Sequence, residues 1–428
     1  MRMKFSRSSQ LVLVATASLA VASLITACET LTVDFVYVAS AKAAGANQYG
    51  EIDVFEINSE SGRMRQIPTS PFPSGGRNPV AEAVSGDNQN LFVVNQDDNT
   101  IVQFAIGTDG KLYPNNTVNT PGIYPLAIAA NKSNVFVVDT FQPLPLCSTA
   151  DPCSGSIAVY PLTTPSSSNN CTATVCLGTP ANNTTVNAQY WPLTVPSAPL
   201  HVIVPTAVNV LASGSYVYVT AYDSTAPSTG GWVFAFGVGS NGVLTAVAGS
   251  PFAAGVQPSA IASGLEGSTN PVPVVYVTDS VRGNVFGYTA SSTGVLTAVS
   301  GSPFPAGNGP SSVAVDPAPA YAYAYVTNST DSTVTAYSIS TSPSSIGVLT
   351  RIGSYATGLQ PVAIGIDPST NHFLFTVNFL DNTVSDFQLS TTAGTLLDAQ
   401  FSPYTTNAQP VAVAAIPHNG TGGGIQAQ

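Results

Sequence analysis

The sequence predicts an all-β chain that folds as a seven-bladed β-propeller with four-stranded blades. Three observations support this fold class. A proline recurs seven times at near-constant spacing, each time before a short strand of small and apolar residues. The segment GVLTAVAGSPFAAGVQP, which starts at Gly242, returns from Gly294 as GVLTAVSGSPFPAGNGP with 13 of 17 positions identical. No segment after the N-terminal signal shows the period of an amphipathic helix.

The recurring proline sets the length of the repeating unit. Successive prolines are separated by 46, 80, 53, 52, 51 and 49 residues. A blade of four short strands and their turns needs about 40 to 50 residues, so each interval corresponds to one blade. The single long interval holds a cysteine-rich insert, about residues 141–200, in the third blade. The prolines are Pro79, Pro125, Pro205, Pro258, Pro310, Pro361 and Pro410.

Within a unit, four segments alternate in the manner of β-strands. A small, apolar strand such as SSVAV is followed by an aromatic and β-branched one such as YVYVT, then by segments such as NVFGY and GVLTAV. The N-terminal unit begins with its second strand, DFVYVAS, and the chain ends on a first strand, PVAVAAIP. Pairing these two strands closes the ring, which places the propeller at residues 34–417 and leaves a flexible, Gly-rich tail at 418–428.

The first 27 residues resemble a bacterial lipoprotein signal. Basic residues precede an apolar run from Leu11 to Leu24, and Ile25-Thr26-Ala27 comes directly before Cys28. An uncleaved membrane helix is the competing interpretation, but the run is short and contains Ser and Thr. We expect Cys28 to be lipidated, residues 28–33 to form a short linker, and the domain to be exported and membrane-anchored in the cell envelope, in the periplasm or at the cell surface.

The acidic composition of the chain excludes some classes of binding partner. Removing residues 1–27 leaves 8 basic and 22 acidic residues, a net charge of −14, which disfavours nucleic acid and anionic lipid surfaces. No phosphate-binding loop, dinucleotide fingerprint or metal-ligand spacing is present, so we expect neither a cofactor nor a metal. We expect a monomer.

Four cysteines fall within one 30-residue stretch of the insert. An even number in an exported chain indicates two disulfides, although the sequence alone leaves their connectivity open. A zinc site is the alternative, but the stretch contains no histidine. The four residues are Cys147, Cys153, Cys171 and Cys176.

The repeat resembles known propeller families. Tyr325-Val326-Thr327-Asn328 is similar to the YVTN-type β-propeller repeat of surface proteins. The wider unit resembles the seven-bladed lactonase family, which includes the propeller form of 6-phosphogluconolactonase and a muconate lactonising enzyme. The resemblance covers about Asp34 to Pro417, and it implies a site of His, Glu and Arg side chains at the mouth of the channel.

Individual residues match that implied site only in part. Arg282, in the segment Val281-Arg282-Gly283-Asn284, matches an Arg-Gly pair after a second strand. The histidine before the inner strand of the third blade is absent, and Asp223 stands in for the acidic residue. The three histidines of the chain lie at 201, in the linker after the insert, and at 372 and 418.

Two further groups of polar residues are candidates. Glu82 occupies the third place after its proline, where the other six units have Ile or Val, so it is either a functional carboxylate or half of an ion pair with Arg77. Polar residues also close the second strand in five units, where they form either a ring on the binding face or ordinary turns. These are Asn95, Asp139, Asp279, Asn328 and Asn378.

Two functions follow from these residues. Our main hypothesis is a non-enzymatic binding or scaffold module whose propeller face takes a protein or glycan. The alternative is a hydrolase of an uncharged lactone, in which Arg282 stabilises the oxyanion and Glu82 or Asp223 acts as the base.

Overall fold

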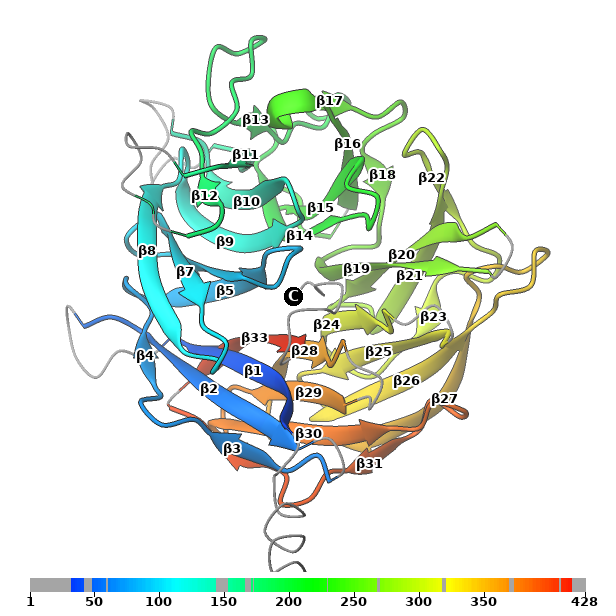
Figure 1. The fold of residues 1–428 in the computed structure, drawn as a ribbon. Helices are drawn as coiled ribbons and strands as arrows, with labels where there is room; N and C mark the ends of the chain where they lie inside the picture. Colours follow the sequence, from blue (N-terminus) through cyan, green and yellow to red (C-terminus); the bar gives the residue numbers. More distant parts are fainter. Residues whose placement is uncertain are drawn as a thin grey trace, which may run out of the picture.

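In the computed structural model, seven antiparallel sheets stand around a central axis as the blades of a propeller (Figure 1). This arrangement confirms the predicted fold class. The signal, Cys28 and the C-terminal tail lie outside the described residues, and within those residues no helix is long and apolar enough to span a membrane. The structure describes residues 32–41, 48–58, 61–143, 153–165, 171, 173–228, 230–267, 270–317, 321–368, 373–407 and 409–417.

From its inner to its outer strand, each of the first four blades has four or five strands. Blade 1 contains β33 (Pro410–Pro417), β1 (Thr32–Ser40), β2 (Glu51–Asn58), β3 (Met64–Gln66) and β4 (Phe72–Pro73). Blade 2 contains β5 (Pro79–Val84), β6 (Asn90–Asn95), β7 (Thr100–Ile106) and β8 (Leu112–Asn119). Blade 3 contains β9 (Ile123–Ala130), β10 (Asn134–Phe141), β11 (Ser156–Thr163), β12 (Cys176–Leu177) and β13 (Trp191–Pro192). Blade 4 contains β14 (Ile203–Val210), β15 (Tyr216–Asp223), β16 (Gly231–Val238), β17 (Leu244–Ala246) and β18 (Phe252–Ala253), with the short 3-10 helix η1 (Ser240–Gly242) before β17.

The remaining three blades repeat the pattern. Blade 5 contains β19 (Pro258–Glu266), β20 (Val272–Asp279), β21 (Asn284–Ala290), β22 (Leu296–Ala298) and β23 (Phe304–Pro305). Blade 6 contains β24 (Pro310–Val315), β25 (Tyr323–Asn328), β26 (Thr333–Ile339) and β27 (Leu349–Ala356). Blade 7 contains β28 (Pro361–Ile366), β29 (Phe373–Asn378), β30 (Thr383–Leu389), β31 (Leu396–Asp398) and β32 (Tyr404–Thr405).

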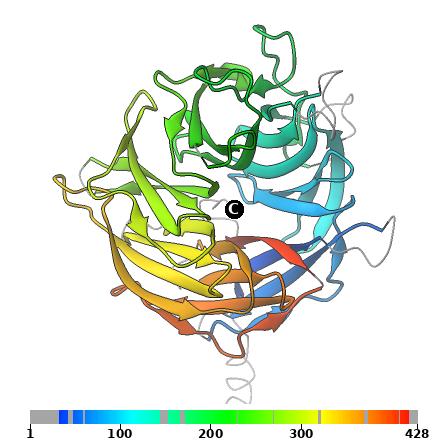
Figure 2. The ribbon, with the colours of Figure 1, turned by 180° about the vertical axis from the view of Figure 1, so that it is seen from behind.

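The two ends of the described chain close the ring. β33 pairs antiparallel with β1 from Asp34 opposite Pro417 to Ser40 opposite Pro410. The red and blue strands lie side by side in Figures 1 and 2, where they form the inner half of one blade. The predicted pairing of the C-terminal strand with the N-terminal blade is therefore confirmed.

Each inner strand begins on the face where the second strand of the same blade ends. Pro258, for example, lies opposite Asp279, and Pro310 lies opposite Asn328. The loops between second and third strands and the crossings between blades therefore open on one face, which we call the mouth.

Hydrophobic cores fill the spaces between neighbouring blades, and buried tyrosine hydroxyls cross them. Tyr276 in blade 5 donates a hydrogen bond to the carbonyl of Gly347 in blade 6 at 2.8 Å. Tyr218 donates to Gly294 at 3.0 Å in the same way. Gly294 has φ of 79°, and a Cβ there would lie 2.3 Å from the ring of Tyr216. The glycine that opens GVLTAV is therefore required both by the turn and by the adjacent blade.

The Ser-Pro-Phe segments interrupt the outer strands. Ser302 accepts a hydrogen bond from the backbone N–H of Gly287 at 3.0 Å, and Ser250 accepts one from Ala235 at 2.9 Å. The serine hydroxyl thus satisfies a ladder donor at the point where the outer strand breaks. The following aromatic, such as Phe304, packs into the core between blades 5 and 6.

The insert of blade 3 takes the place of a continuous outer strand. β11 is an ordinary third strand, whereas the short strands β12 and β13 pair with its two ends. Cys171 and Cys176 form a disulfide, so the structure settles one pairing that the sequence left open. Cys153 is also disulfide-bonded, and Cys147 lies outside the described residues.

Truncation tests the ring closure. A chain that ends at residue 409 lacks β33 and leaves β1 with an unpaired edge, so we expect it to aggregate or to lose its cooperative unfolding transition. A chain that ends at Pro417 is the control and should unfold like the intact protein. A native-like melting curve from the shorter chain would contradict this account.

Glycine substitution tests the contact between blades. Gly294→Ala places a methyl group against Tyr216 in a backbone conformation that alanine resists, so we expect a loss of about 2 kcal/mol or more in unfolding free energy. Gly237→Ala is the matched control, because its Cβ would meet only ordinary contacts at 3.7 and 3.8 Å. Urea denaturation measures both, and equal effects would contradict the assigned role of Gly294.

Candidate functional site

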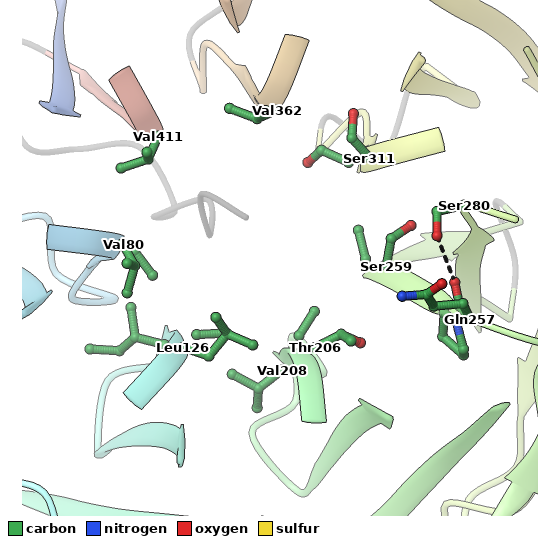
Figure 3. Close-up of a pocket in the computed structure, with 17 residues that line it drawn as sticks. Val80, Leu126, Thr206, Val208, Gln257, Ser259, Ser280, Ser311, Val362 and Val411 are labelled. Atoms are coloured by element: carbon green, nitrogen blue, oxygen red, sulfur yellow. Dashed lines mark hydrogen bonds between the residues drawn. The ribbon is translucent and has the colours of Figure 1, made fainter. Parts of the chain in front are cut away.

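A cavity of about 310 Å³ lies on the propeller axis and is lined by residues from all seven inner strands (Figure 3). This volume is within the range of small-molecule sites. One wall position recurs in every blade, the residue directly after the repeated proline. These residues are Val80, Leu126, Thr206, Ser259, Ser311, Val362 and Val411.

The cavity has a polar side and an apolar side. Blades 4, 5 and 6 contribute hydroxyl groups, and Gln257 and Ser280 extend this polar side toward the mouth. We call the four aliphatic residues of blades 1, 2, 3 and 7 the apolar arc. No charged side chain lines the cavity among the described residues. The apolar arc consists of Val80, Leu126, Val362 and Val411.

The hydroxyl hydrogens on the polar side are directed into the protein. Ser259 donates to the carbonyl of Pro310 in the next blade at 2.7 Å, and its oxygen lies 2.7 Å from the hydroxyl of Thr278. Ser311 repeats this contact with the carbonyl of Pro361, also at 2.7 Å. Because a serine hydroxyl has one hydrogen, these side chains offer the cavity lone pairs and not donors.

The mouth beside blade 4 carries a histidine–aspartate pair. Nδ1 of His201 is hydrogen-bonded to Oδ2 of Asp223, whose other oxygen accepts backbone N–H groups from Thr225 at 2.9 Å and Ala226 at 3.0 Å. The Asp223 side chain is 1% exposed, whereas that of His201 is 38% exposed. A buried carboxylate therefore orients a histidine that water can reach.

The register places this pair above the cavity wall. Asp223 lies opposite Ile203, two residues beyond Pro205, which corresponds to roughly 7 Å along the strand. Thr206, which follows Pro205, lines the cavity. The pair thus sits at the rim of the same mouth, on the blade that begins the polar side.

Asp279 organises the neighbouring rim of blade 5. Its carboxylate accepts backbone N–H groups from Gln257 at 3.2 Å and Arg282 at 3.2 Å, together with those of Val256 and Val281. Gln257 directs its side-chain amide toward the cavity, and its carbonyl accepts a hydrogen bond from the Ser280 hydroxyl at 3.2 Å (Figure 3). Arg282 is exposed on the following loop.

The predicted ring of second-strand residues is fully buried. All five side chains are 0% exposed, and several of them bond the crossings between blades. Asn328 accepts the N–H of Gly307 at 3.0 Å, Asp139 accepts that of Gly122 at 3.1 Å, and the Asn95 amide contacts Ser74 at 3.0 Å. The amide of Asn378 donates to Ser385 at 2.9 Å within blade 7. These buried side chains hold the loops that form the mouth through hydrogen bonds and do not face its surface.

Glu82 lies between blades 1 and 2 and does not line the cavity. Its side chain is 1% exposed, and burial raises its pKa to about 8. The backbone amides of Ala39 and Ala414 oppose this rise, but neither carboxyl oxygen has a hydrogen-bond partner of ordinary geometry among the described residues. The alternative ion pair with Arg77 is wrong, because Arg77 binds Asp98, with Nε 2.6 Å from Oδ1.

The structure therefore groups the candidates differently from the sequence. Asp223 and Arg282 reach the mouth on adjacent blades, whereas Glu82 is buried two blades away from blade 4. His201 cannot be recognised as a site residue from the sequence, because nothing in the linker indicates that it meets Asp223. Gln257 is likewise absent from the predicted site, although its position directly before the repeated proline can be identified in every unit.

The titration of Glu82 gives a pH-dependent prediction. Its pKa rises from an ordinary 4.5 to about 8 on folding, so between these values the folded chain keeps a proton that the unfolded chain has lost. Stability should therefore fall as pH rises from 5 to 8, with Glu82 contributing up to about 1.4 kcal/mol per pH unit. Glu82→Gln should reduce this slope, whereas Asp398→Asn, on the exposed part of β31, should not. Urea denaturation across this pH range measures the slope, and an unchanged slope in Glu82→Gln would refute the assignment.

Solved structures similar to this chain share its fold. The periplasmic gluconolactonase PpgL of Pseudomonas aeruginosa superposes with a TM-score of 0.66 at 14% identity, covering 90% of this chain and 99% of the other. A proposed 6-phosphogluconolactonase from Bacteroides fragilis gives a TM-score of 0.65 at 18% identity, with coverage of 91% and 99%. At these identities the likeness establishes the architecture alone. No curated protein sequence matches the chain.

The family model described as "Lactonase, 7-bladed beta-propeller" matches residues 37–143 and 195–410. The matched segments include the inner strands of blades 2 to 7 and stop at Pro410, the first residue of β33. The unmatched residues between them coincide with the cysteine-rich insert of blade 3. The chain therefore belongs to the seven-bladed β-propeller lactonase family.

Proposed function

We propose that this protein hydrolyses an uncharged lactone at the mouth above blades 4 and 5. The observation that carries the proposal is the bond between His201 and the buried Asp223, on the face where the axial cavity opens. Membership of the lactonase family supports the reaction class. The comparisons thus favour the alternative of the sequence analysis over a protein- or glycan-binding module, for which they offer no support.

The pair suits general base catalysis. Because a carboxylate can only accept, Nδ1 of His201 donates to Asp223, and in the neutral imidazole Nε2 keeps its lone pair. Nε2 takes a proton from water as the water oxygen bonds to the lactone acyl carbon. The ring C–O bond then breaks, and the same proton passes to the leaving alkoxide, giving the hydroxy acid. In this scheme Asp223 is a positioning residue and His201 replaces it as the base.

Two groups on blade 5 can stabilise the developing oxyanion. The side-chain amide of Gln257 points into the cavity, and the guanidinium of Arg282 is exposed on the next loop. Both are held through their backbone N–H groups by Asp279. Asp279 thus fixes the backbone from which both donor side chains extend.

The electrostatics favour an uncharged substrate. The cavity lining carries no cation among the described residues, and Arg77 at the rim of blade 2 is already paired with Asp98. A phosphorylated lactone would lose hydration without gaining a matching charge cluster. We therefore expect a substrate class other than the phosphorylated lactone in the name of the Bacteroides neighbour.

We also propose that the domain is exported and anchored through Cys28. The support is the N-terminal sequence, together with the periplasmic gluconolactonase among the similar structures. β1 starts at Thr32 on the face opposite the mouth, because its other end, Ser40, pairs with Pro410 at the mouth. An anchor four residues before Thr32 would leave the mouth facing away from the membrane.

Hydrolysis of a panel of neutral and phosphorylated lactones by the purified protein tests the proposal. We expect turnover of neutral lactones only, and a loss of about 100-fold or more in kcat/KM for His201→Asn. Glu82→Gln is the control and should retain activity, while Arg282→Ala reports the contribution of the guanidinium. Absence of turnover on every lactone, or full activity in His201→Asn, would overturn the proposal and return attention to a binding role.

A further inference from the structure

The wall of the axial cavity is apolar on one side and polar on the other, and hydrolysis of a lactone does not by itself require this difference. The wall position after the repeated proline is aliphatic in four consecutive blades around the ring and carries a hydroxyl in the other three. Figure 3 shows Val411, Val80 and Leu126 on one side and Gln257, Ser259 and Ser280 on the other. A ligand that fills this space must therefore be apolar along one side.

The serine hydroxyls on the polar side can accept hydrogen bonds from a ligand but cannot donate them. The hydroxyl hydrogens of Ser259 and Ser311 are bound to carbonyl oxygens of the next blade, and that of Ser280 is bound to the carbonyl of Gln257. Among the described residues, the side-chain amide of Gln257 has no hydrogen-bond partner, and it faces the cavity (Figure 3). It is the donor best placed to receive a carbonyl oxygen, such as the acyl oxygen of a lactone.

We propose that the substrate is a lactone with an aliphatic side chain, bound with its acyl oxygen at the Gln257 amide and its side chain against the apolar arc. The lactone group in this inference rests on the proposed function, whereas the aliphatic side chain rests on the residues of the cavity wall. A polyhydroxylated sugar lactone is disfavoured, because its hydroxyls would face Val80, Leu126, Val362 and Val411 without partners.

Direct binding separates this inference from catalysis. The His201→Asn protein is titrated by calorimetry with δ-valerolactone, with δ-decalactone, which adds a pentyl chain to the same ring, and with D-glucono-1,5-lactone, which adds hydroxyls. We expect δ-decalactone to bind about tenfold or more tightly than δ-valerolactone, since each buried methylene favours binding. Glucono-1,5-lactone should bind more weakly than δ-decalactone.

Substitutions in the wall locate the two contacts. Val80→Thr with Val411→Thr keeps the shape and adds hydroxyls to the apolar arc, so it should reduce the preference for the pentyl chain about tenfold while leaving δ-valerolactone unchanged. Gln257→Leu should weaken both alkyl lactones by a similar factor. Val243→Thr, on the outer part of blade 4, is the control and should change neither; Val243 is 43% exposed.

The outcomes distinguish the two proposals. Equal binding of δ-decalactone and glucono-1,5-lactone, or an unchanged preference in the Val80/Val411 double variant, overturns the aliphatic substrate even if sugar lactones are hydrolysed. Tight, arc-dependent binding of δ-decalactone without hydrolysis by the wild-type protein supports the inference on the cavity and overturns the proposed function. A thermal melt of each variant shows whether it is folded.

Discussion

Closure of the ring by β33 and β1 is the constraint on which the rest of the structure depends. Every blade is a small sheet that cannot bury both faces alone, and each core is shared with a neighbour, as between β33 and β28 on one side and β5 on the other. Closure brings seven inner strands to one level at the mouth. The axial cavity exists only because the same position, directly after the proline, arrives seven times at that level.

The repeated sequence encodes contacts between blades more than contacts within them. Gly294 receives the Tyr218 hydroxyl of the preceding blade, and Ser302 completes the ladder where the outer strand breaks. A unit that must fit its neighbour on both sides tolerates little change at these places, which accounts for the near-identity of the two quoted segments. The wall position after the proline is more variable, with Val, Leu, Thr or Ser, and only its serines at 259 and 311 bond the next blade.

The polar residues of the mouth form two groups, one buried and one partly exposed. Asp279 and Asn328 are 0% exposed and bond backbone groups, so they shape loops. His201 and Gln257 are partly exposed and have polar atoms directed outward or into the cavity. The two sets are joined, since Asp279 holds the backbone of Gln257 and Asp223 holds the ring of His201. The proposed reaction at the mouth therefore depends on carboxylates that do not themselves reach a substrate.

The sequence by itself determined the architecture: the number of blades, the closing strand and the place of the cysteine-rich insert. These follow from short-range periodicity, turn chemistry and spacing, which each unit repeats. Only the tertiary structure decided the site. His201 and Asp223 are 22 residues apart and meet because β15 extends two residues beyond the level of Pro205. The polar and apolar sides of the cavity form only when inner strands from seven distant segments come together around the axis. The burial of Glu82, which keeps it away from the mouth, is likewise a property of the packed ring.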